Sequence, residues 1–240
     1  MQVFDETLID PSIWDRFRNI AVGRYLLQRE HEFIERSLTK RAQKPGRILE
    51  LACCTGRVSE RLRAGGHQVI GVDLDPVVLA LYHNRSKHTP LFRGDLLELP
   101  FEKGSFDCIL AIQCISYFNP NDFFQECNRV LSPGGLLVLQ AVNRRNYKRV
   151  IKQVIRARSN GFRPADTIHT EEWIQTLEAH RFVIQEIRGY NWMPFMPENA
   201  RLSDSKLVDV AARVETALEL HRFPSVSRWL LIAARKGSEA

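Results

Sequence analysis

The stretch Ile48-Leu-Glu-Leu-Ala-Cys-Cys-Thr-Gly56 decides the fold. Its apolar first half predicts a short buried strand, and the small residues after it predict a tight turn that ends at Gly56. An amphipathic segment with Val58 and Leu62 follows, which indicates a helix. A strand, a turn of small residues and a helix in this order let a ligand approach the backbone closely.

A second apolar strand is predicted over residues 68–73, and it ends in a carboxylate. This residue, Asp73, lies 23 positions after Glu50. A carboxylate about 20 residues beyond such a turn is placed to accept the two hydroxyls of an adenosine ribose. The turn lacks the G-x-G-x-x-G pattern of a pyrophosphate site, and the acid Glu50 before it suits a ligand that carries an ammonium group. Together these features indicate an adenosine-containing cofactor other than a dinucleotide.

In these residues the sequence resembles the class I (Rossmann-like) S-adenosylmethionine-dependent methyltransferases, in particular their small-molecule, type 11/25-like branch. The first motif of that family is acid-x-Gly-x-Gly-x-Gly, and its defined positions are occupied here by Glu50, Ala52, Cys54 and Gly56. Ala52 and Cys54 stand where the family mostly has glycine, and the side chain of Cys54 is expected to weaken the approach of the methionine part of the cofactor. Further matches follow in order: Asp73, Gly94–Leu96, Leu99–Phe101, Ser105–Asp107 and Leu131–Gly135.

The resemblance implies S-adenosyl-L-methionine as cofactor, S-adenosyl-L-homocysteine as product and no metal. Asp73 would accept the ribose hydroxyls, and Asp95 with Leu96 would read the adenine amino group. The full set of implied cofactor contacts is Glu50, Ala52, Cys54, Gly56, Asp73, Leu74, Asp95, Leu96 and Gln113.

Methyl transfer from a sulfonium needs mainly alignment of the two partners, and a base is required only when the nucleophile must lose a proton. His169 is the first candidate base, because it lies between a basic segment and a helix predicted over 170–179. A lone histidine is also typical of a helix cap or a surface position. Tyr117, just beyond the fourth strand, is the second candidate catalytic residue.

The alternation of strands and helices predicts a parallel sheet covered on both faces. The resemblance implies a three-layer α/β/α, doubly wound, mostly parallel seven-stranded sheet whose antiparallel last strand lies at the sheet's edge. Helices are predicted over 16–39, 76–84, 120–130, 170–179 and 205–220, the last with Leu207, Val210, Val214 and Leu218 at helical spacing. Further strands are predicted over 106–112, 135–142, 182–187 and 229–235.

With 240 residues the chain can bury a full core in one domain. We expect an N-terminal helical segment (1–46), a cofactor-binding half (47–142), a basic lid-like insertion (143–165) and a C-terminal half (166–240) that contains an aromatic loop (190–204).

The basic insertion is responsible for the net charge of +6, since residues 144–163 hold eight Lys and Arg and no Asp or Glu. Its pattern is typical of a basic amphipathic helix that meets anions: a phosphorylated or carboxylated acceptor, lipid headgroups or nucleic acid. A solvated outer face is the alternative. Arg145 and Lys148 are therefore candidate acceptor contacts.

The aromatic loop carries large apolar side chains and two prolines, which fits either a wall of an apolar acceptor pocket or a cover for the helix over 205–220. Trp192 and Phe195 are its candidate acceptor contacts. Arg24 and Tyr25 on the N-terminal helix are further candidates, with helix packing as the alternative for Tyr25.

The start of the chain lacks the pattern of a signal peptide, and no apolar run approaches the ~18 residues of a membrane span. Five cysteines without metal-like spacing indicate reduced thiols in a cytoplasmic protein. A peripheral contact with a membrane and the oligomeric state stay open.

Three functions compete. The leading one is a methyltransferase that acts on O, N or C of a small-molecule acceptor, which is anionic and partly apolar if the two unusual segments contact it. The second is an RNA or tRNA methyltransferase that uses residues 144–163 as a phosphate track. The third is a non-catalytic cofactor-binding scaffold, suggested by Cys54.

Overall fold

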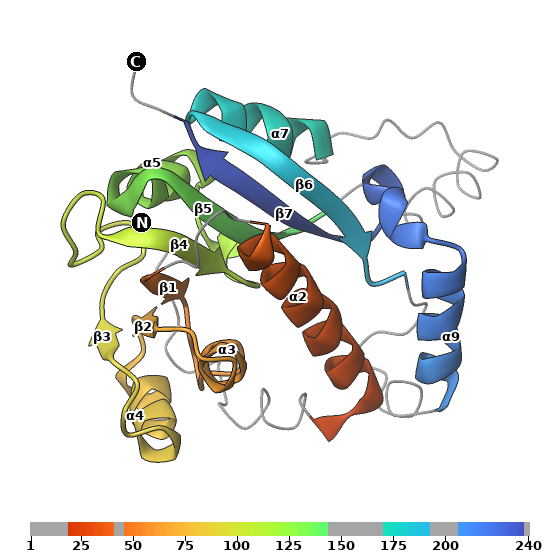
Figure 1. Ribbon diagram of the computed structural model, residues 1–240, viewed down its shortest axis with the longest axis horizontal. Helices are drawn as coiled ribbons and strands as arrows, with labels where there is room; N and C mark the ends of the chain where they lie inside the picture. Colours follow the sequence, from red (N-terminus) through yellow and green to blue (C-terminus); the bar gives the residue numbers. More distant parts are fainter. Residues whose placement is uncertain (1–18, 41–45, 144–169, 193–205, 238–240) are drawn as a thin grey trace, which may run out of the picture.

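The computed structural model describes residues 19–40, 46–143, 170–192 and 206–237 (Figure 1). Strands and helices alternate as expected from the sequence. The helices are α2 (Ala21–Thr39), α3 (Ser59–Ala64), α4 (Pro76–Arg85), α5 (Pro120–Val130), α7 (Thr170–Ala179) and α9 (Lys206–Ala217), with short 3₁₀ turns η1 (Ile115–Tyr117), η2 (Leu220–Arg222) and η3 (Pro224–Val226). The strands are β1 (Ile48–Leu51), β2 (Val69–Asp73), β3 (Leu91–Arg93), β4 (Phe106–Ala111), β5 (Leu131–Val142), β6 (Phe182–Tyr190) and β7 (Trp229–Lys236).

The strands form one seven-stranded sheet in the order β3-β2-β1-β4-β5-β7-β6. The chain winds outward from β1 to β3 and then returns to β4 on the other side of β1, which makes the sheet doubly wound. Pairing is parallel except at β7, which runs antiparallel to both of its neighbours. The predicted fold class, including the antiparallel last strand, is confirmed.

The position of the last strand differs from the expectation, because β7 lies inside the sheet and β6 forms its edge. The side chains explain this order. Residues 230–234 of β7 are apolar and buried without alternation, as suits a strand covered on both faces, whereas β6 carries polar, partly exposed residues such as Gln185 and Arg188.

The start of β5 also differs from the strand predicted over 135–142, because residues 131–134 already belong to the strand. Leu131 pairs with Phe106, and the next pair is Leu136 with Cys108. The extra residues on β5 form a bulge, and Gly134 inside it has a φ of 70°.

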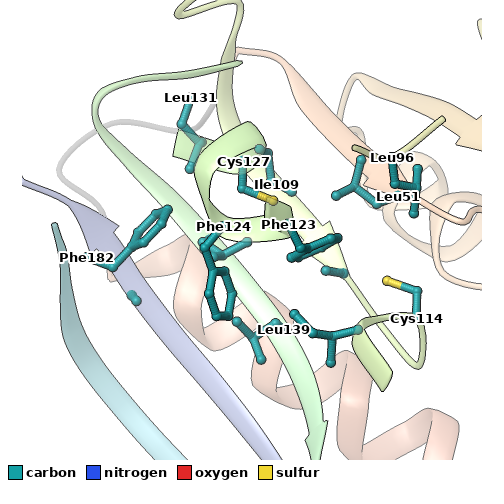
Figure 2. Packing of buried hydrophobic residues seen from close by; sticks show 14 of the residues in the cluster. Leu51, Leu96, Ile109, Cys114, Phe123, Phe124, Cys127, Leu131, Leu139 and Phe182 are labelled. Atoms are coloured by element: carbon teal, nitrogen blue, oxygen red, sulfur yellow. The ribbon is translucent and has the colours of Figure 1, made fainter. Parts of the chain in front are cut away.

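Successive residues of a strand point to opposite faces of the sheet, and each face has its own hydrophobic core. Leu49 and Leu51 point to one face, where they join the buried side chains of α5 and α7. Figure 2 shows Phe123, Phe124 and Cys127 of α5 directed at the strands on this face, where they form the buried side of the helix. On the other face, residues of α2, α3 and α9 pack with Ile48 and its neighbours.

Helix α9 forms where predicted, but it does not bury its apolar stripe. Leu207, Val210, Val214 and Leu218 are exposed. Val208 and Glu215 face inward instead. The inward face of α9 therefore includes a carboxylate, which is hydrogen-bonded to Tyr25.

All five cysteines lie in the described ranges and are thiols, as expected. Among the described helices none is long and apolar enough to cross a bilayer. The proposed division of the chain into four segments stays a prediction.

The turn after β1 generates a stability prediction. A Cβ at Gly56 would lie 2.2 Å from the ring of Tyr82, and φ there is 81°. Gly56→Ala should therefore lower the free energy of unfolding by about 2–5 kcal/mol, through overpacking and an unfavourable left-handed backbone. Gly134→Ala is the matched control, because φ is 70° there but no described atom lies within 4 Å of the added Cβ. It should cost about 1–2 kcal/mol. Urea unfolding measures both, and equal losses would contradict the packing argument.

Candidate functional site

The turn between β1 and α3 has an alternating backbone conformation. Ala52 (φ 50°), Cys54 (φ 48°) and Gly56 (φ 81°) all adopt the left-handed region. This region favours glycine and costs roughly 1–2 kcal/mol for other residues, so strain is concentrated at this turn. The two departures from the glycine pattern therefore keep the glycine conformation. Strained turns of this kind cluster at ligand sites.

The thiols of this turn are not poised for reaction. Burial, followed by the negative charge of Asp73, raises the pKa of Cys54 to about 11. Burial also raises the pKa of Cys53. Both side chains are therefore protonated at neutral pH and act as small residues of the turn.

Asp73 ties the end of β2 to this turn. Its Oδ2 accepts a hydrogen bond from the backbone N–H of Cys54 at 2.9 Å, and its Oδ1 accepts one from Asp75 at 3.1 Å. Burial raises the pKa of the carboxyl, while these two N–H donors oppose the shift. A carboxylate has about four acceptor positions, so this one can also accept from ribose hydroxyls. The site thus fits an adenosine group.

Glu50 lies behind the turn, with only 3% of its surface exposed. Its Oε2 accepts hydrogen bonds from the backbone N–H of Ser59 at 3.0 Å and from the Ser59 hydroxyl. The carboxylate therefore supports the first turn of α3. Its predicted contact with the methionine moiety stays a prediction.

The predicted adenine side presents a mixed surface. Leu74 follows Asp73 directly and is 53% exposed, which leaves its side chain available to a flat apolar ligand. Asp95 is exposed and its Oδ1 accepts a hydrogen bond from the backbone of Leu97 at 2.9 Å. Leu96 is buried in the core. Of these residues, Leu74 and Asp95 have side chains that a ligand can reach.

A buried carboxylate that the sequence analysis missed joins α2 to the site. Glu30 is 1% exposed. Its Oε1 accepts from Gln113 Nε2 at 2.9 Å and from the Tyr190 hydroxyl at 2.9 Å, and its Oε2 pairs with Arg57 Nη1 at 3.0 Å. Gln113, two residues after β4, is itself in the left-handed region, with φ 62°. Glu30 therefore fixes the side chains of Gln113 after β4, of Tyr190 at the end of β6 and of Arg57 after the turn.

A second buried pair lies next to it. The Tyr25 hydroxyl donates to Glu215, and the Trp192 backbone N–H reaches the same carboxylate at 3.4 Å. Asn191 donates its backbone N–H to the Tyr25 oxygen at 3.3 Å. Burial raises the pKa of Tyr25 well above its ordinary value and also raises that of Glu215. The structure thus brings together two candidate acceptor contacts, Tyr25 and Trp192, around a carboxylate that the sequence analysis missed.

The remaining candidates are less central. Tyr117 ends η1 and is 57% exposed. Arg24 is exposed and donates to the backbone oxygen of Asn19. His169, Arg145, Lys148 and Phe195 lie outside the described residues.

The chain resembles known methyltransferases in sequence. Residues 49–139 match the family model described as a methyltransferase domain. The chain is 26% identical over 190 residues to the uncharacterized methyltransferase YodH of Bacillus subtilis. The aligned residues cover 76% of this chain and 78% of that protein. It is 28% identical over 165 residues to a probable S-adenosylmethionine-dependent methyltransferase of Mycolicibacterium smegmatis, across 67% of this chain and 61% of that protein.

A solved structure has the same fold. Geranyl diphosphate C-methyltransferase from Streptomyces coelicolor A3(2) superposes with a TM-score of 0.59 at 20% identity, over 87% of this chain and 79% of that protein. It was solved in complex with Mg²⁺, geranyl diphosphate and S-adenosyl-L-homocysteine. At this identity the likeness concerns the fold, and the sequence matches indicate the family.

Glu30 generates a prediction about stability. Glu30→Ala removes the carboxylate that pairs with Arg57 inside the protein, which should lower the free energy of unfolding by about 3–5 kcal/mol. Glu32→Ala is the matched control on the same helix, because the Glu32 side chain is 48% exposed in its ion pair with Arg29. It should cost about 0–1 kcal/mol. Denaturant unfolding of both variants measures the difference, and a Glu30 variant as stable as the Glu32 variant would show that the buried network is not formed.

Proposed function

Since the chain is a class I S-adenosylmethionine-dependent methyltransferase, we propose that it transfers a methyl group to an oxygen, nitrogen or carbon atom of a small-molecule acceptor. The observation that carries the proposal is the contact between Asp73 and the strained turn after β1. It lies where the strand order reverses between β1 and β4, and the carboxyl ends of strands at such a point flank the ligand crevice of doubly wound folds.

Different residues around the crevice would bind different parts of S-adenosyl-L-methionine. Asp73 would accept the ribose hydroxyls, Leu74 would cover one face of the adenine, and the turn 52–56 would hold the methionine part. The bound cofactor supplies a methyl group that is already activated by its sulfonium. The protein therefore has to align the acceptor and exclude water, and orientation alone can supply on the order of 7–11 kcal/mol.

The acceptor is proposed to bind where the carboxyl end of β6 meets α2. Tyr25, Trp192 and Glu215 are joined there by hydrogen bonds. The high pKa of Tyr25 keeps its hydroxyl protonated at neutral pH, so it can donate a hydrogen bond but cannot act as a base in this state. A base, where the acceptor needs one, is proposed to be His169 or Tyr117. The anionic character of the acceptor, a metal-free reaction and a cytoplasmic location are also proposals from the sequence.

The RNA alternative depends on residues 144–163, which lie outside the described residues. The proposal of a small-molecule acceptor is supported by described residues and by the related proteins. The scaffold alternative drew its support from Cys54, and that residue keeps the backbone conformation of the glycine it replaces.

Turnover tests the proposed function directly. The protein is incubated with S-adenosyl-L-methionine and a metabolite extract, and mass spectrometry follows S-adenosyl-L-homocysteine and metabolites that gain one methylene. We expect both to rise together. Binding of the cofactor without any methylated product, across extracts and an RNA pool, would contradict the enzymatic proposal.

Asp73 provides the sharpest test of the cofactor site. Asp73→Ala should weaken S-adenosyl-L-methionine binding by about 1–3 kcal/mol, because charged hydrogen bonds to the ribose are lost. Asp75→Ala is the control, since this neighbour caps α4 through the N–H of Val77 at 2.7 Å and has no proposed ligand contact. Calorimetric titration gives both affinities, and thermal unfolding of both variants separates binding from folding. Equal affinity of wild type and Asp73→Ala would refute this placement of the ribose.

A further inference from the structure

A cavity of about 250 Å³ lies between α2, α9 and the carboxyl end of β6 (Arg188–Tyr190), away from the turn after β1. Figure 1 shows α2 and α9 on either side of this region. In the sheet, β4, β5 and β7 separate β6 from β1, so the cavity is distinct from the proposed cofactor site. Its titratable wall consists of Arg29, Glu32, Arg36, Arg188, Glu215 and His221.

The two acids of this wall already have partners. Glu32 accepts from Gln28 Nε2 at 2.9 Å and pairs with Arg29 at 3.2 Å. Glu215 accepts from Tyr25 and from the Trp192 backbone. Both carboxylates therefore already accept hydrogen bonds from groups of the protein.

Beside β6, three positively charged side chains share a single carboxylate. One carboxylate, Glu186, is shared by Lys40 at 2.7 Å, Arg188 at 2.5 Å and Arg36 at 3.6 Å. The last distance is too long for a normal hydrogen bond. With Arg29, Glu32 and Glu215 of the wall included, these groups carry four positive and three negative charges, an excess of one that becomes two when His221 is protonated. A hollow whose wall carries an excess of positive charge attracts anions.

His221 closes this end of the cavity. Burial, and then the charge of Arg188, lower the pKa of its ring. Arg36 from α2 and Arg222 beside it act in the same direction, and Glu219 opposes them. An anion in the cavity would offset these charges and favour the protonated ring. The cavity acids Glu32 and Glu215 also face this space.

We propose that this cavity binds a small metabolite through a dianionic oxygen group, such as a phosphate monoester or a dicarboxylate, held by Arg36, Arg188 and His221. Planar guanidinium groups bind such oxygens in a bidentate manner, and two charges on the ligand match the local excess when the His221 ring is protonated. The size suits a small ligand, since drug-sized molecules fill about 300–1,000 Å³. Glu215 of this wall also belongs to the proposed acceptor position, so the cavity adjoins that position. The inference does not rest on methyl transfer, and its test needs no S-adenosyl-L-methionine.

The test is calorimetric titration of the whole protein with phosphate, sulfate and malonate at constant ionic strength. We expect saturable binding of at least one of these anions with a Kd at or below ~1 mM. Arg36→Gln and Arg188→Gln should each weaken it about tenfold or more, since each removes charged hydrogen bonds. A preference for the tetrahedral anions would indicate a phosphorylated ligand, and one for malonate a dicarboxylate.

Arg222→Gln is the matched control, because Arg222 adjoins His221 but pairs with Glu219 at 3.1 Å and is 65% exposed. It should change the affinity less than about twofold. Thermal unfolding and circular dichroism show whether the variants are folded. The proposal is overturned by no saturation at ~10 mM anion, by unchanged affinity in both folded cavity variants, or by an equal loss in Arg222→Gln.

The pH dependence with sulfate gives an independent readout, because sulfate keeps both charges between pH 6 and 8. His221 has a lowered pKa in the free protein and takes up a proton when the anion binds. Affinity should therefore rise as pH falls from 8 to 6, and His221→Gln should flatten this dependence. The same slope in wild type and His221→Gln would show that the ring does not contact the anion.

Discussion

The proposed site depends on one contact, the hydrogen bond from the backbone N–H of Cys54 to the carboxylate of Asp73. It ties the end of β2 to the turn after β1, so two separate strand ends become one rigid edge. The turn needs this support, because Ala52 and Cys54 hold a backbone conformation that is costly for residues with a side chain. The same carboxylate orders the start of α4 through Asp75. A ligand that binds Asp73 therefore meets a surface whose position is already set.

Two buried acids extend this order across the sheet. Glu30 connects α2 to Gln113, Tyr190 and Arg57, while Glu215 connects α9 to Tyr25. Removing a charge from water is expensive, and such groups are retained where several donors surround them. Glu30 thus positions Tyr190 of β6 and Gln113 after β4, and Glu215 positions Tyr25 of α2. The hydrophobic cores supply the scaffold, and these polar contacts fix the geometry at its edge.

Much of the fold could be predicted because its signals are local. Local signals of this kind are the run from Ile48 to Gly56, the carboxylate Asp73, and the pairs Asp75-Pro76 and Asn119-Pro120, in which a capping residue precedes the proline that begins α4 and α5. The sequence could not place Glu30 and Glu215 in the site, since their partners lie far along the chain and an acid on a helix usually faces solvent. The same limit applies to α9, where the apolar spacing of Leu207 and Val210 indicated an inward face, but these side chains are exposed and Glu215, which accepts from Tyr25, faces inward. The place of β7 inside the sheet depended on pairing with β6, which no local pattern encodes.

The most direct test of the central claim is a crystal structure of the protein with S-adenosyl-L-homocysteine. The account predicts the nucleoside in the crevice between β1 and β4, with both ribose hydroxyls on the Asp73 carboxylate, the adenine against Leu74 and the homocysteine along the turn 52–56. A nucleoside bound elsewhere on the protein, or in that crevice with its ribose away from Asp73, would contradict the account.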